Sequence, residues 1–112
     1  MCQIFAGQDP HTYAYETRSV RLMGHATSVR LEARFWTILE EIVAEQHMTM
    51  AKFLSKLYEE ALTTHGEVQN FASLLRCSCL IYLSRDFDRA RLEREAKTAA
   101  PRVMVPLGIA GE

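Results

Sequence analysis

The stretch "SVRLMGHATSVRL", Ser19–Leu31, contains the tetrapeptide Ser-Val-Arg-Leu twice, with the two copies nine residues apart. In each copy a polar residue alternates with an apolar one, which is the two-residue period of a β-strand. In the second copy, Val29 and Leu31 therefore point to one face. Ser28 and Arg30 point to the opposite face. The stretch decides the fold because a helical pattern begins directly after it.

The spacing of the two copies requires a change of direction between them. Nine is odd, so the copies would face opposite ways in one regular strand. A one-residue bulge at Gly24 would restore a common face along a longer ribbon. A two-residue turn at Gly24 and His25 would do the same as a hairpin, with Val20 opposite Val29. We favour the second copy as the ribbon and the first as an arm or flanking strand.

The apolar residues after the ribbon recur at the spacing i, i+3, i+4, i+7 and i+8, which is typical of a helix with one buried face. The pattern starts at Glu32 and predicts a helix that ends near His47, since histidine is enriched in the left-handed backbone that ends many helices. Thr49 is expected to cap a second helix with its hydroxyl, and Gly66 is expected to end it.

A third helix is predicted from Val68 or Asn70 to about Leu83. Its last residues, "CSCLIYL", are apolar almost all round, which indicates burial on several sides. The next segment is rich in charges and favours a further helix over residues 86–97. The tail has proline and glycine and no clear period.

At 112 residues the chain is long enough for one modest core. We expect an N-terminal arm (residues 1–17), one domain with the ribbon and the third helix (18–85), and a charged helix with a flexible tail (86–112). The predicted core consists of apolar residues on the buried faces of these elements: Val29, Leu31, Phe35, Ile38, Leu39, Ile42, Phe53, Leu54, Leu57, Phe71 and Leu75.

The single strand region predicts an obligate homodimer. A lone strand or hairpin does not stabilise itself. Its unpaired main-chain N–H and C=O groups need a partner edge, which a second copy of the chain supplies. Antiparallel pairing of two copies gives a two-stranded ribbon that carries Ser28 and Arg30 of both chains on one face.

The composition excludes several classes of protein. No stretch approaches the roughly 20 apolar residues of a membrane span, and the first residues lack the pattern of a signal peptide, so we expect a cytoplasmic protein. The net charge is −1. Positive charge is nevertheless concentrated beside the repeated tetrapeptide, because residues 18–34 contain four arginines and one glutamate.

No motif in the chain indicates an enzyme. The sequence lacks a glycine-rich phosphate loop, a Gly-x-Ser-x-Gly elbow and a His-Glu-x-x-His pair, and its four histidines are widely spaced. Cys77 and Cys79 would lie about 200° apart on a helix. We therefore predict buried structural thiols, with a metal site formed across a dimer as the alternative. The expected protein has no catalytic residue and no cofactor.

Two features of the predicted elements suit DNA. A two-stranded ribbon fits the major groove, where arginine bonds guanine bidentately and serine bonds several base edges. The alternative is a polar strand face that contacts only water. The helix after Thr49 begins with unpaired N–H groups at Met50 and Ala51, which bind phosphate readily. Lys52 in its first turn opposes the helix dipole unless an anion docks there; a simple capped helix is the alternative.

Four consecutive segments resemble the ribbon-helix-helix DNA-binding family, the superfamily of Arc and MetJ: the strand "TSVRL", the helix "EARFWTILEEIVAEQ", the turn "HMT" and the helix "MAKFLSKLYEEAL". Two longer segments, "RSVRLMGHATSVRLEARFW" and "GEVQNFASLLRCSCLIYL", are similar to a bacterial subgroup of small, mostly uncharacterised members. The resemblance covers roughly residues 17–83.

The resemblance implies a mainly α fold with a short β-ribbon, in a ribbon-helix-helix homodimer with an additional C-terminal helix. Its implied function is sequence-specific binding of double-stranded DNA, usually repression, with the ribbon in the major groove. The alternative is a protein-interaction or antitoxin-like module that docks a partner on the third helix and the tail. The expected DNA contacts are Ala26, Ser28 and Arg30 on the bases, and Thr49, Met50, Ala51, Lys52, Arg18 and Arg21 on the phosphates.

Overall fold

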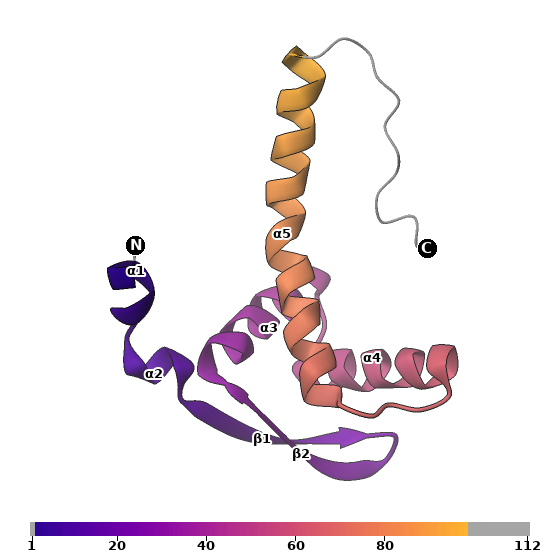
Figure 1. Cartoon of the computed structure of the whole chain (residues 1–112). Helices are drawn as coiled ribbons and strands as arrows, with labels where there is room; N and C mark the ends of the chain where they lie inside the picture. The colour runs from indigo at the N-terminus through magenta and orange to yellow at the C-terminus, as the bar shows by residue number, and fades with distance from the viewer. Residues whose placement is uncertain (1, 99–112) are drawn as a thin grey trace. The chain divides into compact units, whose positions relative to one another are not determined.

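The computed structural model describes residues 2–98 and contains two strands and five helices in that part of the chain (Figure 1). The tail expected after residue 98 lies outside the described residues. In chain order the elements are α1 (Cys2–Ala6), α2 (Pro10–Tyr13), β1 (Tyr15–Leu22), β2 (His25–Glu32), α3 (Ala33–Gln46), α4 (Met50–His65) and α5 (Phe71–Thr98).

β1 and β2 pair antiparallel within one chain, so the first tetrapeptide copy is a hairpin strand and not an arm. The turn consists of Met23 and Gly24, both with positive φ (54° and 85°), as a type I′ hairpin turn requires. It lies one residue earlier than the Gly24–His25 turn considered from the sequence. Val20 consequently faces Thr27, and not Val29 as a Gly24–His25 hairpin would require.

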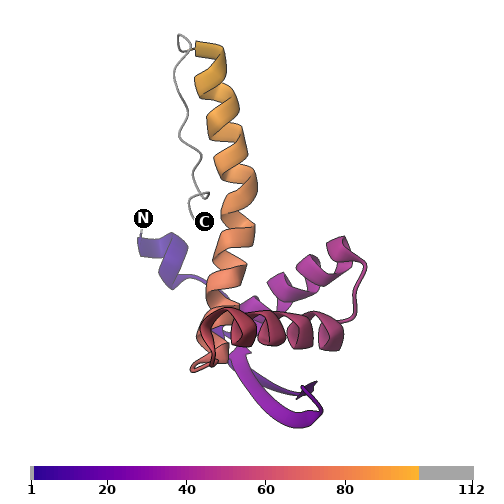
Figure 2. The ribbon, with the colours of Figure 1, turned by 90° about the vertical axis from the view of Figure 1, so that its right-hand side faces the viewer.

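The hairpin has one outward and one inward face, as the alternation predicted. Ser28 and Arg30 are exposed, whereas Val29 and Leu31 are buried. The earlier turn shifts the partner of Val20 from Val29 to Thr27. Because this shift is an even number of residues, it leaves the two faces unchanged. In Figure 1 and Figure 2, α3, α4 and the first turns of α5 lie on the same side of the hairpin.

The two helices after the ribbon end and begin where the sequence predicted. His47 adopts the left-handed conformation (φ 57°) after α3, and Gly66 does so after α4 (φ 83°). The Thr49 hydroxyl accepts a hydrogen bond from the main-chain N–H of Lys52 at 3.1 Å. The caps at His47 and Thr49 fix the short turn between α3 and α4.

α5 is longer than the predicted third helix. It begins at Phe71, where the Asn70 side chain accepts from the N–H of Ser73 at 3.1 Å, and it continues without a break to Thr98. The predicted helix end near Leu83 is therefore wrong, and the charged segment continues the same helix. The segment between these points contains neither glycine nor proline, so nothing in it ends a helix.

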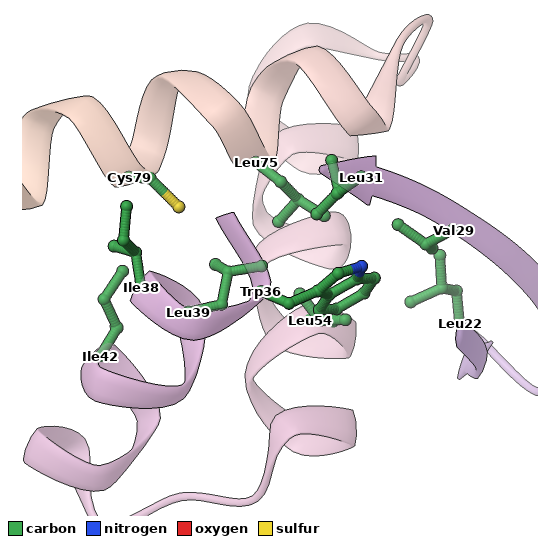
Figure 3. Packing of buried hydrophobic residues seen from close by; sticks show 10 residues of the cluster. All are labelled: Leu22, Val29, Leu31, Trp36, Ile38, Leu39, Ile42, Leu54, Leu75 and Cys79. Carbon is green, nitrogen blue, oxygen red and sulfur yellow. The ribbon is translucent and has the colours of Figure 1, made fainter. Parts of the chain in front are cut away.

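The core lies between the inner face of the hairpin and the three long helices (Figure 3). Seven of the predicted core residues are buried, and Phe35, Phe53, Leu57 and Phe71 pack against them at its margin. Leu22 and Trp36 were not predicted to be buried, whereas Cys79 was predicted as a buried thiol. The buried cluster consists of Leu22, Val29, Leu31, Trp36, Ile38, Leu39, Ile42, Leu54, Leu75 and Cys79.

The two neighbouring cysteines of α5 have different environments. Cys79 is buried, its Sγ lies 3.7 Å from the Phe35 carbonyl oxygen, and burial raises the pKa of its thiol to about 11. Cys77 is exposed, so the prediction of two buried thiols is wrong for this residue. The helical period explains the difference, because positions two apart lie on nearly opposite faces.

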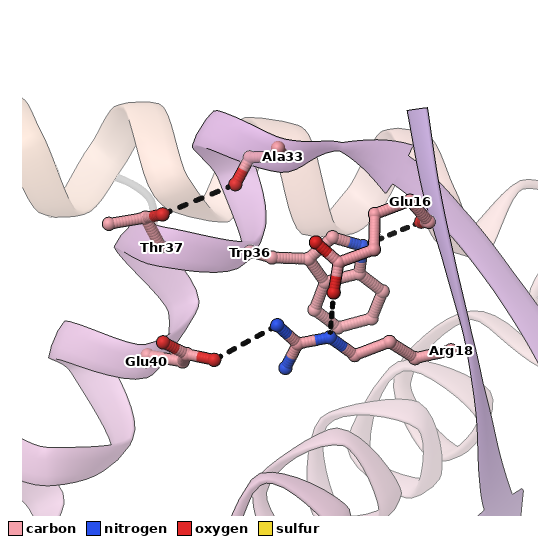
Figure 4. A network of polar contacts seen from close by, with 6 residues as sticks. All are labelled: Glu16, Arg18, Ala33, Trp36, Thr37 and Glu40. Atoms are coloured by element: carbon pink, nitrogen blue, oxygen red, sulfur yellow. Dashed lines mark hydrogen bonds and ion pairs between the residues drawn. The ribbon is translucent and has the colours of Figure 1, made fainter. Parts of the chain in front are cut away.

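Trp36 connects the hairpin to α3 (Figure 4). Its indole N–H donates to the carbonyl oxygen of Glu16 in β1 at 2.8 Å, and the residue is only 1% exposed. The Arg18 guanidinium lies over the ring at 4.5 Å and forms ion pairs with Glu16 (2.7 Å) and with Glu40 of α3 (3.0 Å). Strand β1 is thus held to α3 through both an apolar and a polar contact.

We predict that Trp36→Ala lowers the free energy of unfolding by about 3–5 kcal/mol, since it leaves a large cavity and an unmade hydrogen bond. Urea unfolding followed by circular dichroism measures this change. Tyr13→Ala is the matched control, because Tyr13 is 54% exposed and a surface truncation changes stability by about 0.5 kcal/mol or less. Equal losses in the two variants would contradict the anchoring role of Trp36.

Candidate nucleic-acid interface

The outward face of the hairpin is a continuous polar surface, which we call the ribbon face. It is formed by alternate residues of both strands, and hydroxyl groups occupy its centre, where Ser19 lies opposite Ser28. Arginines flank this centre, because Arg21 lies opposite Ala26 near the turn and Arg30 lies towards the other end. The exposed residues of the ribbon face are Tyr15, Thr17, Ser19, Arg21, Ala26, Ser28 and Arg30.

The charge of the ribbon face is positive. Its two charged exposed side chains are those of Arg21 and Arg30. Glu32 is directed to the same side of β2 as Arg30, but its carboxylate accepts a hydrogen bond from Arg76 of α5 at 2.9 Å. This bond holds the pKa of the Glu32 carboxyl below its ordinary value and partly neutralises its charge. The face can therefore receive an acceptor-rich, negatively charged ligand.

The three expected base-contacting residues lie together, and the structure adds Tyr15 beside them. Ala26, Ser28 and Arg30 follow one another along the ribbon face. The guanidinium carbon of Arg30 lies 4.1 Å from the centroid of the Tyr15 ring. Sequence analysis assigned Tyr15 to the N-terminal arm, although its even spacing from Ser19 and Arg21 is a signal that it shares their face.

The expected phosphate contacts are divided between two places. Arg21 lies on the ribbon face, and its guanidinium donates to the Gly24 carbonyl at 2.8 Å. Arg18 points to the opposite face, where Glu16, Glu40 and Trp36 surround its guanidinium. The structure therefore does not bring Arg18 together with the other expected phosphate contacts.

The first turn of α4 presents main-chain donors. Thr49 occupies the N–H of Lys52 with its hydroxyl and the N–H of Phe53 with its carbonyl oxygen. Within the described residues, no hydrogen bond is made by the N–H groups of Met50 and Ala51. One turn further on, Ser55 donates to the Arg21 carbonyl oxygen at 3.4 Å. The start of α4 therefore lies at the turn end of the hairpin.

The edge of β2 that faces away from β1 carries main-chain groups suited to strand pairing. In a two-residue hairpin the residues that flank the turn form a hydrogen-bonded pair, and such pairs alternate along the strands. Because Leu22 and His25 flank the turn, the N–H and C=O groups of Ala26, Ser28 and Arg30 point to the outer edge. No bond to these groups is made by the chain between residues 2 and 98.

A second surface suited to a partner lies between the end of α3 and the start of α4. There a hollow of about 210 Å³ is lined mainly by the apolar side chains of Ile42, Met48, Phe53 and Leu57. Phe53 and Leu57 are only partly buried in the single chain. An apolar hollow on the surface of the single chain is a surface that a second copy can cover.

The described residues hold no cluster of three or more histidine, cysteine or acidic side chains placed to bind a metal ion. Among the described helices, none combines the length and apolar character needed to cross a membrane. The ribbon face and the first turn of α4 remain the candidate site.

A polar β-ribbon that leads directly into two capped helices is the architecture of a ribbon-helix-helix domain. A family model described as ribbon-helix-helix domain matches residues 15–83, and the chain belongs to this family. Domains of the family typically bind DNA as dimers and are generally not enzymes.

The chain is also similar to a solved structure, that of an uncharacterized protein from Bordetella pertussis Tohama I. The two share 40% sequence identity with a TM-score of 0.71, over 96% of this chain and 79% of the other. Among curated proteins, no match to the chain was found. The likeness supports the fold of the described residues.

Proposed function

We propose that the protein is a homodimeric transcription regulator, acting as a repressor, that binds double-stranded DNA sequence-specifically through its ribbon face. The observation that carries the proposal is the division of β2: Ser28 and Arg30 are exposed, while the intervening Val29 is buried in the core. The exposed residues Ser28 and Arg30 present a hydroxyl and a guanidinium group, and both groups can bond to base edges in the major groove.

The dimer we propose pairs the outer edge of β2 with the same edge of a second copy. The resulting sheet has the order β1, β2, β2 of the partner, β1 of the partner. Its outermost strands lie about 14 Å apart, at roughly 4.8 Å per step, whereas the major groove is about 12 Å wide. The two central strands therefore enter the groove, and sheet twist carries the outer strands over its rims.

This arrangement assigns different roles to the two strands. Ser28 and Arg30 on β2 face the base edges. Arg21 on β1 lies above the groove rim, on the side of the phosphates. The first turn of α4 lies at the same end of the hairpin and offers the N–H groups of Met50 and Ala51 to a phosphate. Phosphate contacts position the dimer, and base contacts supply its specificity.

We predict that Arg30→Ala lowers the ratio of specific to non-specific DNA affinity about 5- to 150-fold for each half-site, the loss of one bidentate base contact there. Preferred sites are first selected from random duplexes with the wild type. Fluorescence anisotropy at two salt concentrations then measures both affinities.

Arg34→Ala is the matched control for this measurement, because it removes the same charge from an exposed position on α3. It should reduce both affinities slightly and leave their ratio unchanged. An unchanged ratio in Arg30→Ala would contradict the assignment of the ribbon face as the surface that contacts the bases.

We predict that Ser28→Pro weakens the dimer about ten- to hundredfold while the fold of each chain is retained, because a symmetric interface loses the N–H donor twice. Proline is tolerated where the N–H points away from its own sheet. Analytical ultracentrifugation measures dissociation, and circular dichroism measures the fold. Val29→Pro is the contrast, since the N–H of Val29 faces β1 and its loss should also destabilise the single chain. A fully dimeric Ser28→Pro variant would refute this pairing.

The second candidate function is a protein-interaction or antitoxin-like module, favoured by one observation on α5. Leu80 and Ile81 are 58% and 71% exposed in the single chain. If they dock a partner protein, Leu80→Asp should abolish co-purification of that partner from native cells and leave DNA affinity unchanged. A partner retained by Leu80→Asp would contradict docking on this face, as would a loss of DNA affinity.

A further inference from the structure

We propose that Tyr15 is a positioning residue that holds the Arg30 guanidinium in place for reading guanine. The inference rests on the proposed function and assigns a base and a supporting residue to the same face. Tyr15 belongs to β1, whereas Arg30 belongs to β2, so the first tetrapeptide strand contributes to recognition without itself entering the groove.

The Arg30 guanidinium lies over the Tyr15 ring, which is the geometry of a cation–π pair. Arg30 lies opposite Thr17 and Tyr15 lies opposite Glu32, so that the two side chains are diagonal neighbours on the ribbon face. The guanidinium carbon is 4.1 Å from the ring centroid. Tyr15 is 56% exposed, so it contributes little to the core.

Arg30 differs in its contacts from the other two arginines of the hairpin. Arg18 is held by two carboxylates, and Arg21 donates to a carbonyl oxygen. Within the described residues, Arg30 makes no hydrogen bond or ion pair, and its guanidinium contacts the Tyr15 ring. Its in-plane N–H donors therefore remain available.

Stacking on a ring restrains a guanidinium without consuming its donors. The attraction acts on the flat face of the cation, while the N–H groups point outward in its plane. Guanine presents the O6 and N7 acceptors side by side in the major groove, which matches this fork. A restrained arginine loses less side-chain freedom when it binds, so Tyr15 favours the guanine-bound geometry in advance.

The test uses the full chain and the duplexes selected by the wild type. Tyr15→Leu should lower the ratio of specific to non-specific affinity about 2- to 5-fold, the range of an exposed cation–π contact. Tyr15→Phe keeps the aromatic ring and should retain the wild-type ratio. Tyr13 is also exposed but lies in α2, outside the ribbon face, so Tyr13→Leu should leave the ratio unchanged. Thermal unfolding of each variant confirms that the fold is retained.

Two further measurements separate positioning from direct contact. In the Arg30→Ala background, Tyr15→Leu should have no additional effect, because Tyr15 acts through Arg30. Replacing the contacted guanine with 7-deazaguanine removes N7 and should cost the wild type more affinity than it costs Tyr15→Leu.

The outcomes distinguish the inference from the function on which it rests. A wild type that does not discriminate between duplexes would overturn both. A discriminating wild type with an unchanged ratio in Tyr15→Leu would overturn the inference alone. An additional loss from Tyr15→Leu in the Arg30→Ala background would also overturn it, because the ring would then contact DNA itself.

Discussion

The register of the β1–β2 hairpin is the constraint on which both the core and the candidate interface depend. A slip of one residue in β2 would turn that strand over, bury Ser28 and Arg30, and expose Val29 and Leu31. The type I′ turn at Met23 and Gly24 sets the register at one end. At the other end, Trp36 donates to the Glu16 carbonyl and so ties the start of β1 to α3. A hairpin held at both ends keeps its polar face outward.

The same constraint explains why charged residues next to one another in sequence have different roles. Arg18 and Arg21 differ by three positions, an odd number, so the strand period directs them to opposite faces. Arg18 therefore joins the polar network around Trp36, where two carboxylates balance its charge. Arg21 stays on the ribbon face. The local surplus of arginine is thus divided between holding the ribbon in place and facing a ligand.

Much of the fold follows from short-range patterns, and the errors occur where distant parts of the chain meet. The strand alternation, the cap at Thr49 and the left-handed His47 were predictable because each depends on a few neighbouring residues. Trp36 lies just outside the apolar stripe of its helix, and only its contact with β1 explains its burial. The turn position was missed because Met23 adopts a positive φ, which no propensity favours for that residue type. The continuous α5 was missed because the change from apolar to charged composition resembled a boundary.

The candidate site was predictable in part for the same reason. The faces of Ser28 and Arg30 follow from alternation alone, but the neighbour of Arg30 comes from the other strand, and cross-strand contacts depend on register. The intramolecular hairpin also resolves the apparent conflict between a net charge of −1 and a DNA ligand. Recognition depends on the charges that one face presents, and the acids nearest the ribbon are paired: Glu16 and Glu40 with Arg18, and Glu32 with Arg76. The field at the ribbon face is therefore set by Arg21 and Arg30 more than by the sum over the chain.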